Sequence, residues 1–90
     1  MVQKAVKIVN RAGMHTRPAS MIVKIAAKYR ADFYILKDGY QINGKSIIGI
    51  MTLAAEFGSE LILRFDGPDE ERALAEMSAY FEQGFGETLG

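Results

Sequence analysis

One ten-residue stretch, RAGMHTRPAS, contains the only histidine of this 90-residue chain, His15. An imidazole can act as a nucleophile or a proton acceptor near neutral pH, so this residue is the first candidate for chemistry. Gly13 frees the backbone just before it. An amphipathic helix is predicted to start just after it, with Pro18 in the first turn, where a missing N–H group costs nothing. His15 should therefore lie beside the free amides and the positive dipole end of a helix, an arrangement that binds anions.

The chemistry that best suits this placement is phosphoryl transfer. A neutral imidazole nitrogen can attack a phosphoryl group, and the resulting P–N bond is readily passed on. The product dianion needs donors close by, which Arg17 and the first-turn amides can supply. The plainer alternative is that His15 is a surface side chain or a polar group satisfied by a loop carbonyl, and the residues alone leave it open.

Composition disfavours several other kinds of site. The chain has no cysteine, so it can form neither a disulfide nor a thiolate zinc site, and we expect no metal and no cofactor. The Gly-x-Ser-x-Gly motif of many hydrolases is absent, which disfavours turnover of a small molecule. Eleven basic and eleven acidic side chains balance, which disfavours nucleic acid binding. No apolar run is long enough for a signal peptide or a membrane span, so we expect a soluble, cytoplasmic protein.

A second stretch, NGKSIIGIM, combines a turn, a helix-capping residue and an unusually apolar short helix. Ser46 stands at the N-cap position, where an added phosphate would meet the positive dipole end. Ile47, Ile48 and Met51 cannot all face inward on one short helix, so some should be exposed, as a partner-docking surface requires. The alternative that they are core residues behind an ordinary capping serine stays open.

The elements that position these stretches are predicted from hydrophobic periodicity and turn residues. Alternation predicts strands over Val2–Val9, Phe33–Leu36, Tyr40–Ile42 and Leu61–Phe65, with a type I′ turn at Asp38-Gly39. Helical spacing predicts helices from Thr16 to about Tyr29, from Ile47 to about Leu53, and from an Asp69 cap to Gly84, which should leave a loose tail. The order β-α-β-β-α-β-α predicts one α+β domain over residues 1–90, with helices on one face of a mainly antiparallel sheet.

Together the two stretches point to a family. GMHTRPAS resembles the active-centre signature of HPr, the histidine-containing phosphocarrier of the bacterial phosphoenolpyruvate-dependent sugar phosphotransferase system. NGKSIIGIMTL resembles the regulatory serine segment of the same family, about thirty residues further on, as in that family. The resemblance implies an open-faced β-sandwich, in which a four-stranded antiparallel sheet in the order 1-4-2-3 is covered on one face by three helices.

The resemblance also implies roles for individual residues. His15 would accept a phosphoryl group on Nδ1 from phosphorylated Enzyme I and donate it to a histidine of IIA proteins, so the chain would be a carrier and not an independent enzyme. Arg17 would pair with the phosphate, Thr16 and Arg17 would lend their backbone amides, and Pro18 would fix the turn. Many relatives carry a small polar side chain three positions before the histidine, where this chain has Ala12. One hydrogen bond to the phosphohistidine is therefore expected to be missing.

The same resemblance implies a regulatory site and its partners. Ser46 would match the serine modified by the ATP-dependent HPr kinase/phosphorylase, and a catabolite-control transcription regulator would then be a further partner. The docking surface is assigned to Met21, Lys24, Ile47, Ile48 and Met51. Core packing explains Met21 equally well, and a solvated helix face explains Lys24 equally well. We expect a monomer.

Three hypotheses for the function follow. The first is a phosphocarrier modified at His15 in each transfer. The second is a regulatory binding module that phosphorylation of Ser46 switches, with little or no role in sugar transport. The third is a small structural domain with an incidental histidine, in which replacing His15 by alanine would change no function.

Overall fold

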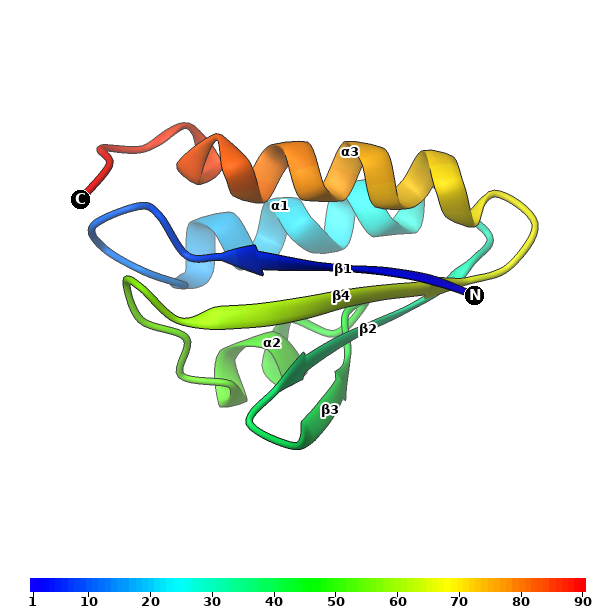
Figure 1. Cartoon of the computed structure of the whole chain (residues 1–90), viewed down its shortest axis with the longest axis horizontal. Coiled ribbons are helices and arrows are strands. Elements are labelled where there is room, and N and C mark those ends of the chain that lie inside the picture. Colours follow the sequence, from blue (N-terminus) through cyan, green and yellow to red (C-terminus); the bar gives the residue numbers. More distant parts are fainter.

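All residues, 1–90, are described by the computed structural model, and the predicted element order is confirmed. The strands are β1 (Val2–Lys7), β2 (Asp32–Lys37), β3 (Tyr40–Asn43) and β4 (Glu60–Asp66). The helices are α1 (Thr16–Ala27), α2 (Ile47–Thr52) and α3 (Glu70–Glu82), and a short 3-10 turn, η1 (Gly84–Gly86), follows them. In Figure 1, α1 and α3 run side by side over the sheet, and α2 lies near β3. No helix has the length and apolar character that crossing a membrane requires.

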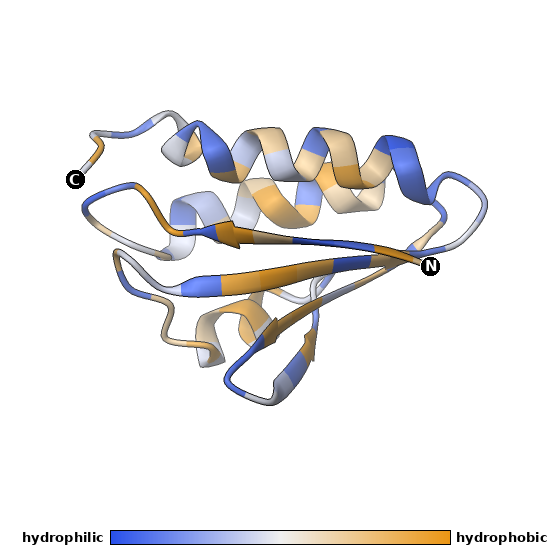
Figure 2. Cartoon of the chain, in the orientation of Figure 1, coloured by the Kyte–Doolittle hydropathy of each residue, from blue (hydrophilic) through white to orange (hydrophobic).

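The four strands form one antiparallel sheet in the order β1-β4-β2-β3, as predicted. In β4, Leu61, Leu63 and Phe65 are buried, and Ile62 and Arg64 between them are partly exposed. This alternation places the hydrophobic side chains on the face that the helices cover. Figure 2 shows that most of β4 is hydrophobic, because the partly exposed Ile62 is apolar as well.

The core lies between this sheet and the helices. Its centre is a stacked aromatic pair, Phe33 of β2 and Phe65 of β4, with ring centroids 4.3 Å apart. Gly44 must be a glycine, because a Cβ atom there would lie 2.2 Å from the ring of Phe33. The other large, fully buried apolar side chains are Ile8, Ile22, Ile35, Ile50, Leu61, Leu63, Met77 and Phe81. A single hydrophobic core therefore holds the helices on the sheet.

Two turn predictions have different outcomes. Asp38 and Gly39 both have positive φ, at 50° and 84°, which confirms the type I′ turn between β2 and β3. Asp69 precedes α3 as predicted, but its side chain does not cap that helix. Its carboxylate instead accepts hydrogen bonds from the amides of Arg30 and Ala31, at 2.8 and 2.9 Å. Asp69 thus ties the start of α3 to the loop between α1 and β2.

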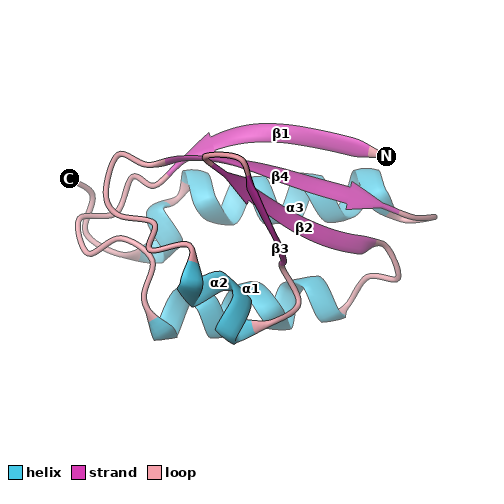
Figure 3. Cartoon of the chain, turned by 90° about the horizontal axis from the view of Figure 1, so that it is seen from below, coloured by secondary structure: helices cyan, strands magenta, loops and turns pink.

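The prediction of a loose tail after Gly84 is wrong. The last residues pair with the loop that follows β1, since the amide of Arg11 donates to the carbonyl of Thr88 (2.9 Å) and the amide of Gly90 to that of Val9 (3.1 Å). Figures 1 and 3 show the C-terminal segment and this loop at the same end of the molecule. The tail escapes sequence prediction because only tertiary contacts hold it.

Candidate functional site

The loop before α1 sets the direction in which His15 enters the helix. Gly13 has φ +72°, as a left-handed turn requires, and its amide donates to the carbonyl of Asn10 (3.1 Å). The amide of Met14 donates to the carbonyl of Ala55 (2.8 Å), and a Cβ atom on Gly13 would lie 3.1 Å from the same oxygen. Any other residue at position 13 would therefore be strained and crowded, which confirms the predicted need for glycine.

His15 is the N-cap of α1. Its backbone is extended (φ −141°, ψ −176°), and its carbonyl accepts the first helical hydrogen bond, from Ala19 (3.0 Å). The imidazole makes no capping hydrogen bond, and the amides of Thr16 and Arg17 have no acceptor inside the helix. Pro18 is buried in the first turn, where the fixed φ of proline suits the helix. The ring thus lies beside free donors at the positive end of the helix dipole, as the sequence predicts.

A carboxylate that the sequence did not indicate faces the imidazole. Nε2 of His15 lies 2.8 and 3.0 Å from the two carboxylate oxygens of Glu87, and Arg17 donates a hydrogen bond from Nη2 to the same carboxylate. The Glu87 side chain is only 12% exposed, whereas His15 and Arg17 are 40% and 66% exposed. The pKa of Glu87 is lowered, mainly by the hydrogen bond from His15 and further by Asn10 and Arg17.

Asn10 holds Glu87 in this position. The Asn10 side chain is fully buried, and its Nδ2 donates to Oε1 of Glu87 (2.9 Å) and to the carbonyl of Gly13 (2.8 Å). Both partners are acceptors, so the amide nitrogen must face them and the orientation of the amide is fixed. The Oδ1 atom has no hydrogen-bond partner. Asn10 therefore connects the turn before His15 to the carboxylate that faces it.

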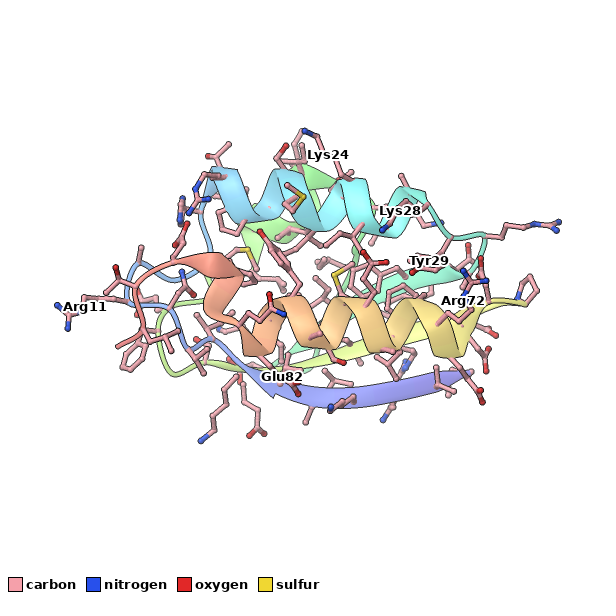
Figure 4. All side chains as sticks on the ribbon, turned by 90° about the horizontal axis from the view of Figure 1, so that it is seen from above. Arg11, Lys24, Lys28, Tyr29, Arg72 and Glu82 are labelled. Carbon is pink, nitrogen blue, oxygen red and sulfur yellow. The ribbon has the colours of Figure 1, made fainter.

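An open pocket of about 600 Å³ surrounds the imidazole. It is lined by Arg11, Ala12, His15, Arg17, Glu87 and Thr88. Figure 4 shows Arg11 projecting outward at this end of the molecule. Ala12 contributes no polar side chain to the pocket. Two guanidinium groups and the free end of a helix favour an anion, and the open shape admits a partner protein.

Sequence reasoning missed Asn10 and Glu87. Asn10 looked like one of several residues that break a strand, and Glu87 like one acid in a flexible tail. The sequence GFGE gave a faint signal, because Gly84 and Gly86 have φ values of +65° and +72° that turn the chain back toward the loop. Nothing in the local pattern indicated what the returning chain would contact.

The second stretch forms α2 as predicted, and Ser46 is its N-cap. Its Oγ accepts a hydrogen bond from the amide of Gly49 (3.1 Å). Ile50 is the residue that faces the core and is fully buried. The apolar residues proposed for docking are exposed instead: Met21 by 42%, Ile47 by 39%, Ile48 by 79% and Met51 by 38%. They are not core residues, and Met21 lies on α1, the helix that α2 contacts.

The lysines of α1 are not gathered around His15. Lys24 is exposed on α1, where it lines, with Met21, an open groove that Glu76 and Tyr80 of α3 complete. Lys28 pairs with Glu76 of α3, and Nζ of Lys45 donates to the carbonyl of Tyr29 (3.0 Å) at the far end of the helix. Arg11 and Arg17 therefore supply the positive side chains of the pocket around His15.

Comparison with known proteins identifies the family. Residues 2–83 match the family described as "PTS HPr component phosphorylation site". The phosphocarrier protein HPr of Treponema pallidum is 44% identical over 97% of this chain and 99% of its own length. The HPr-like protein Crh of Bacillus subtilis is 39% identical, over 92% of this chain and 98% of its own.

Solved structures give the same result. A crystal structure of HPr from Thermoanaerobacter tengcongensis superposes with a TM-score of 0.94 at 37% identity, over 99% of this chain and 100% of that one. A dimer of HPr from the same organism has a TM-score of 0.77 at 37% identity, over 97% of this chain and 100% of that one. The fold, the two matching stretches and these likenesses agree, and the chain belongs to the HPr family of phosphocarrier proteins of the phosphotransferase system, which are not catalytic enzymes.

Proposed function

We propose that this chain accepts a phosphoryl group on His15 from Enzyme I and passes it to IIA proteins during sugar uptake. The observation that carries the proposal is the position of His15 as the N-cap of α1, in an open pocket beside Arg17. The nucleophile and the donors that its product needs are thus together before any partner binds.

Each residue of the first turn has a part in this transfer. The amides of Thr16 and Arg17 are free to donate to phosphate oxygens, and the Arg17 guanidinium can reach the same anion. Pro18 limits the conformations of the turn, so the donors lose little entropy when the phosphate arrives. These groups stabilise the phosphohistidine without enclosing it, which a carrier needs because its phosphate must leave again.

Incubation with Enzyme I from the same organism, magnesium and phosphoenolpyruvate tests the proposal. We expect an acid-labile, base-stable phosphate at His15, located by mass spectrometry, and its transfer to a IIA protein. The matched control is His15→Ala, which should fold normally and stay unmodified. An active Enzyme I that leaves the native chain unmodified would contradict the carrier function.

A second candidate function is regulation through Ser46, and the comparisons do not separate it from transport, because a Crh protein is nearly as similar as HPr. The observation that favours it is the hydroxyl of Ser46 at the start of α2, beside the exposed Ile47, Ile48 and Met51. A phosphate there would change the charge of an apolar docking surface without unfolding the domain. HPr kinase/phosphorylase and a catabolite-control regulator are the proposed partners for this regulatory function.

Binding measurements separate the two functions. If Ser46 is a switch, Ser46→Asp should change the affinity for a regulator while leaving phosphorylation of His15 possible. Equal binding of Ser46→Asp and Ser46→Ala to every candidate partner would contradict the regulatory function, and transport would remain as the only candidate. We propose that the carrier acts as a monomer. Light scattering should then give a mass of about 10 kDa.

A further inference from the structure

We propose that Glu87 is a positioning residue for phosphoryl transfer. Its carboxylate, which Asn10 holds against Nε2 of His15, keeps the imidazole proton on Nε2 and leaves the Nδ1 lone pair for the phosphoryl group. This inference rests on the proposed function and deepens it. The matched family segment ends at residue 83, and Glu87 follows it in the C-terminal segment.

The contact between His15 and Glu87 fixes where the ring proton must be. An ionised carboxylate can only accept hydrogen bonds, so the nitrogen that faces both of its oxygens, at 2.8 and 3.0 Å, must carry hydrogen. A neutral imidazole has one N–H group, so the other nitrogen, Nδ1, then carries the lone pair. Nδ1 makes no capping hydrogen bond with the helix and is free to react.

The carboxylate is held on both sides of the contact. Asn10 is fully buried and uses its amide hydrogens on Glu87 and on the carbonyl of Gly13, so movement of Glu87 would leave a buried donor without a partner. Backbone hydrogen bonds from Arg11 to Thr88 and from Gly90 to Val9 fix the chain that follows Glu87. The ring is therefore oriented by a supported carboxylate, in the way that a buried acid orients a nucleophile's base.

The transfer step uses this arrangement as follows. The Nδ1 lone pair of His15 forms the new N–P bond while the P–N bond of the donor phosphohistidine breaks, and the electron pair of that bond stays on the donor ring. The Nε2 proton remains on His15, so its ring becomes a cation as the bond forms, directly opposite the Glu87 carboxylate. In onward transfer the same ring leaves the phosphorus as neutral imidazole. Glu87 thus stabilises the positive charge that the ring gains as the phosphoryl group arrives and loses as it leaves.

The tautomer can be read by NMR in the unphosphorylated protein, without Enzyme I. At a pH where the ring is neutral, the 15N shifts and long-range couplings of His15 should show the Nε2–H tautomer in the native protein. In Glu87→Ala both tautomers should be populated. The control is Glu82→Gln, an exposed acid at the end of α3 that pairs with Lys4 (3.0 Å), and it should match the native spectrum. An Nδ1–H tautomer in the native protein, or unchanged populations in Glu87→Ala, would overturn the proposal.

Kinetics give the second readout. Phosphoryl transfer from Enzyme I should slow about 10- to 100-fold in Glu87→Ala, the loss expected for a hydrogen bond to a charged group. Glu87→Gln keeps an acceptor for Asn10 and removes the charge, so it should also be slower than the native protein while folding normally. Glu82→Gln should stay within about twofold. Native rates in both Glu87 variants would show that the contact only tethers the tail. If the native protein takes no phosphate at all, the proposed function fails, and the NMR result still decides the role of Glu87.

Discussion

At the scale of single residues, the guanidinium of Arg17 has two anionic partners to bind. It donates to Glu87 in the structure, and the proposed function requires it to meet a phosphate as well. A guanidinium has several donors spread over a plane and can bridge two anions, whereas a lysine ammonium is a single point charge. The 66% exposure of Arg17 leaves its other donors accessible from the pocket.

Arg17→Lys should therefore keep the fold and lose transfer rate. We expect phosphorylation by Enzyme I to slow about 10- to 100-fold, since a charge-assisted hydrogen bond contributes about 1.5–3 kcal/mol. Rapid-quench measurement of phosphohistidine formation checks this, with Arg11→Lys in the same pocket as the matched control. A native rate for Arg17→Lys, equal to that of Arg11→Lys, would mean that positive charge at position 17 is sufficient and the shape of its side chain is not important.

Ala12 allows the opposite experiment, a gain of one interaction. It is exposed and lines the pocket beside His15, so Ala12→Ser places a hydroxyl where the family resemblance implies a small polar group. One added hydrogen bond, about 0.5–1.5 kcal/mol, should lengthen the lifetime of phospho-His15 by about 2- to 10-fold. The half-life of the labelled protein at neutral pH is the measurement. A half-life no longer than that of the native protein would show that the backbone amides and Arg17 already satisfy the phosphate.

At the scale of elements, α2 depends on a single side-chain cap. It is only six residues long, and Ser46 accepts the one side-chain hydrogen bond at its start. Short helices are marginal by themselves, so packing of Ile50 and this cap hold α2 in place. The exposed Ile48 depends on the same helix for its position.

Ser46→Ala should lower the free energy of unfolding by about 1 kcal/mol, as loss of an N-cap does. Ser46→Asp should keep most of it, because a carboxylate can accept the same hydrogen bond and is favoured by the helix dipole. Chemical denaturation of the two variants and the native protein measures the three free energies of unfolding and checks their order. A native-like stability for Ser46→Ala would show that packing alone holds α2, and a phosphate on Ser46 would then act on partners only.

At the scale of the whole molecule, several carboxylates join elements that are distant in sequence. Asp69 ties α3 to the loop after α1, Glu76 joins α3 to α1 through Lys28 and Tyr29, and Glu87 ties the tail to the His15 loop. The pKa of each is lowered, by the amide of Arg30 first for Asp69, by Lys28 first for Glu76 and by His15 first for Glu87. A carboxyl group whose pKa is lower in the folded state stabilises that state only while it is ionised.

Stability should therefore fall in acid and not near neutral pH. The stabilisation that these carboxylates provide is fully present above their unfolded pKa values, about 4. It decreases as the pH falls through their lower pKa values in the folded protein. Calorimetry at a series of pH values should show a constant Tm above about pH 5 and a steady decline below it. In Asp69→Asn the Tm at pH 7 should be lower than native and the acid decline shallower. Parallel Tm curves for the two proteins would mean that Asp69 does not contribute through its charge.

The sequence by itself determined the element order, the sheet order that follows from family resemblance, and the residues His15, Arg17, Pro18 and Ser46 as candidates. It could do so because these features are local: periodicity, a glycine at positive φ, a cap and a first-turn proline depend on neighbours along the chain. Tertiary structure decided what faces the imidazole. Asn10 and Glu87 are 77 residues apart, and only the pairing of the tail with the loop after β1 brings them together. It also decided that Ile48 faces outward and Ile50 inward, because burial depends on the rest of the fold. Asp69 binds the loop after α1 instead of capping α3, because amide donors that are distant in sequence outweigh the local preference.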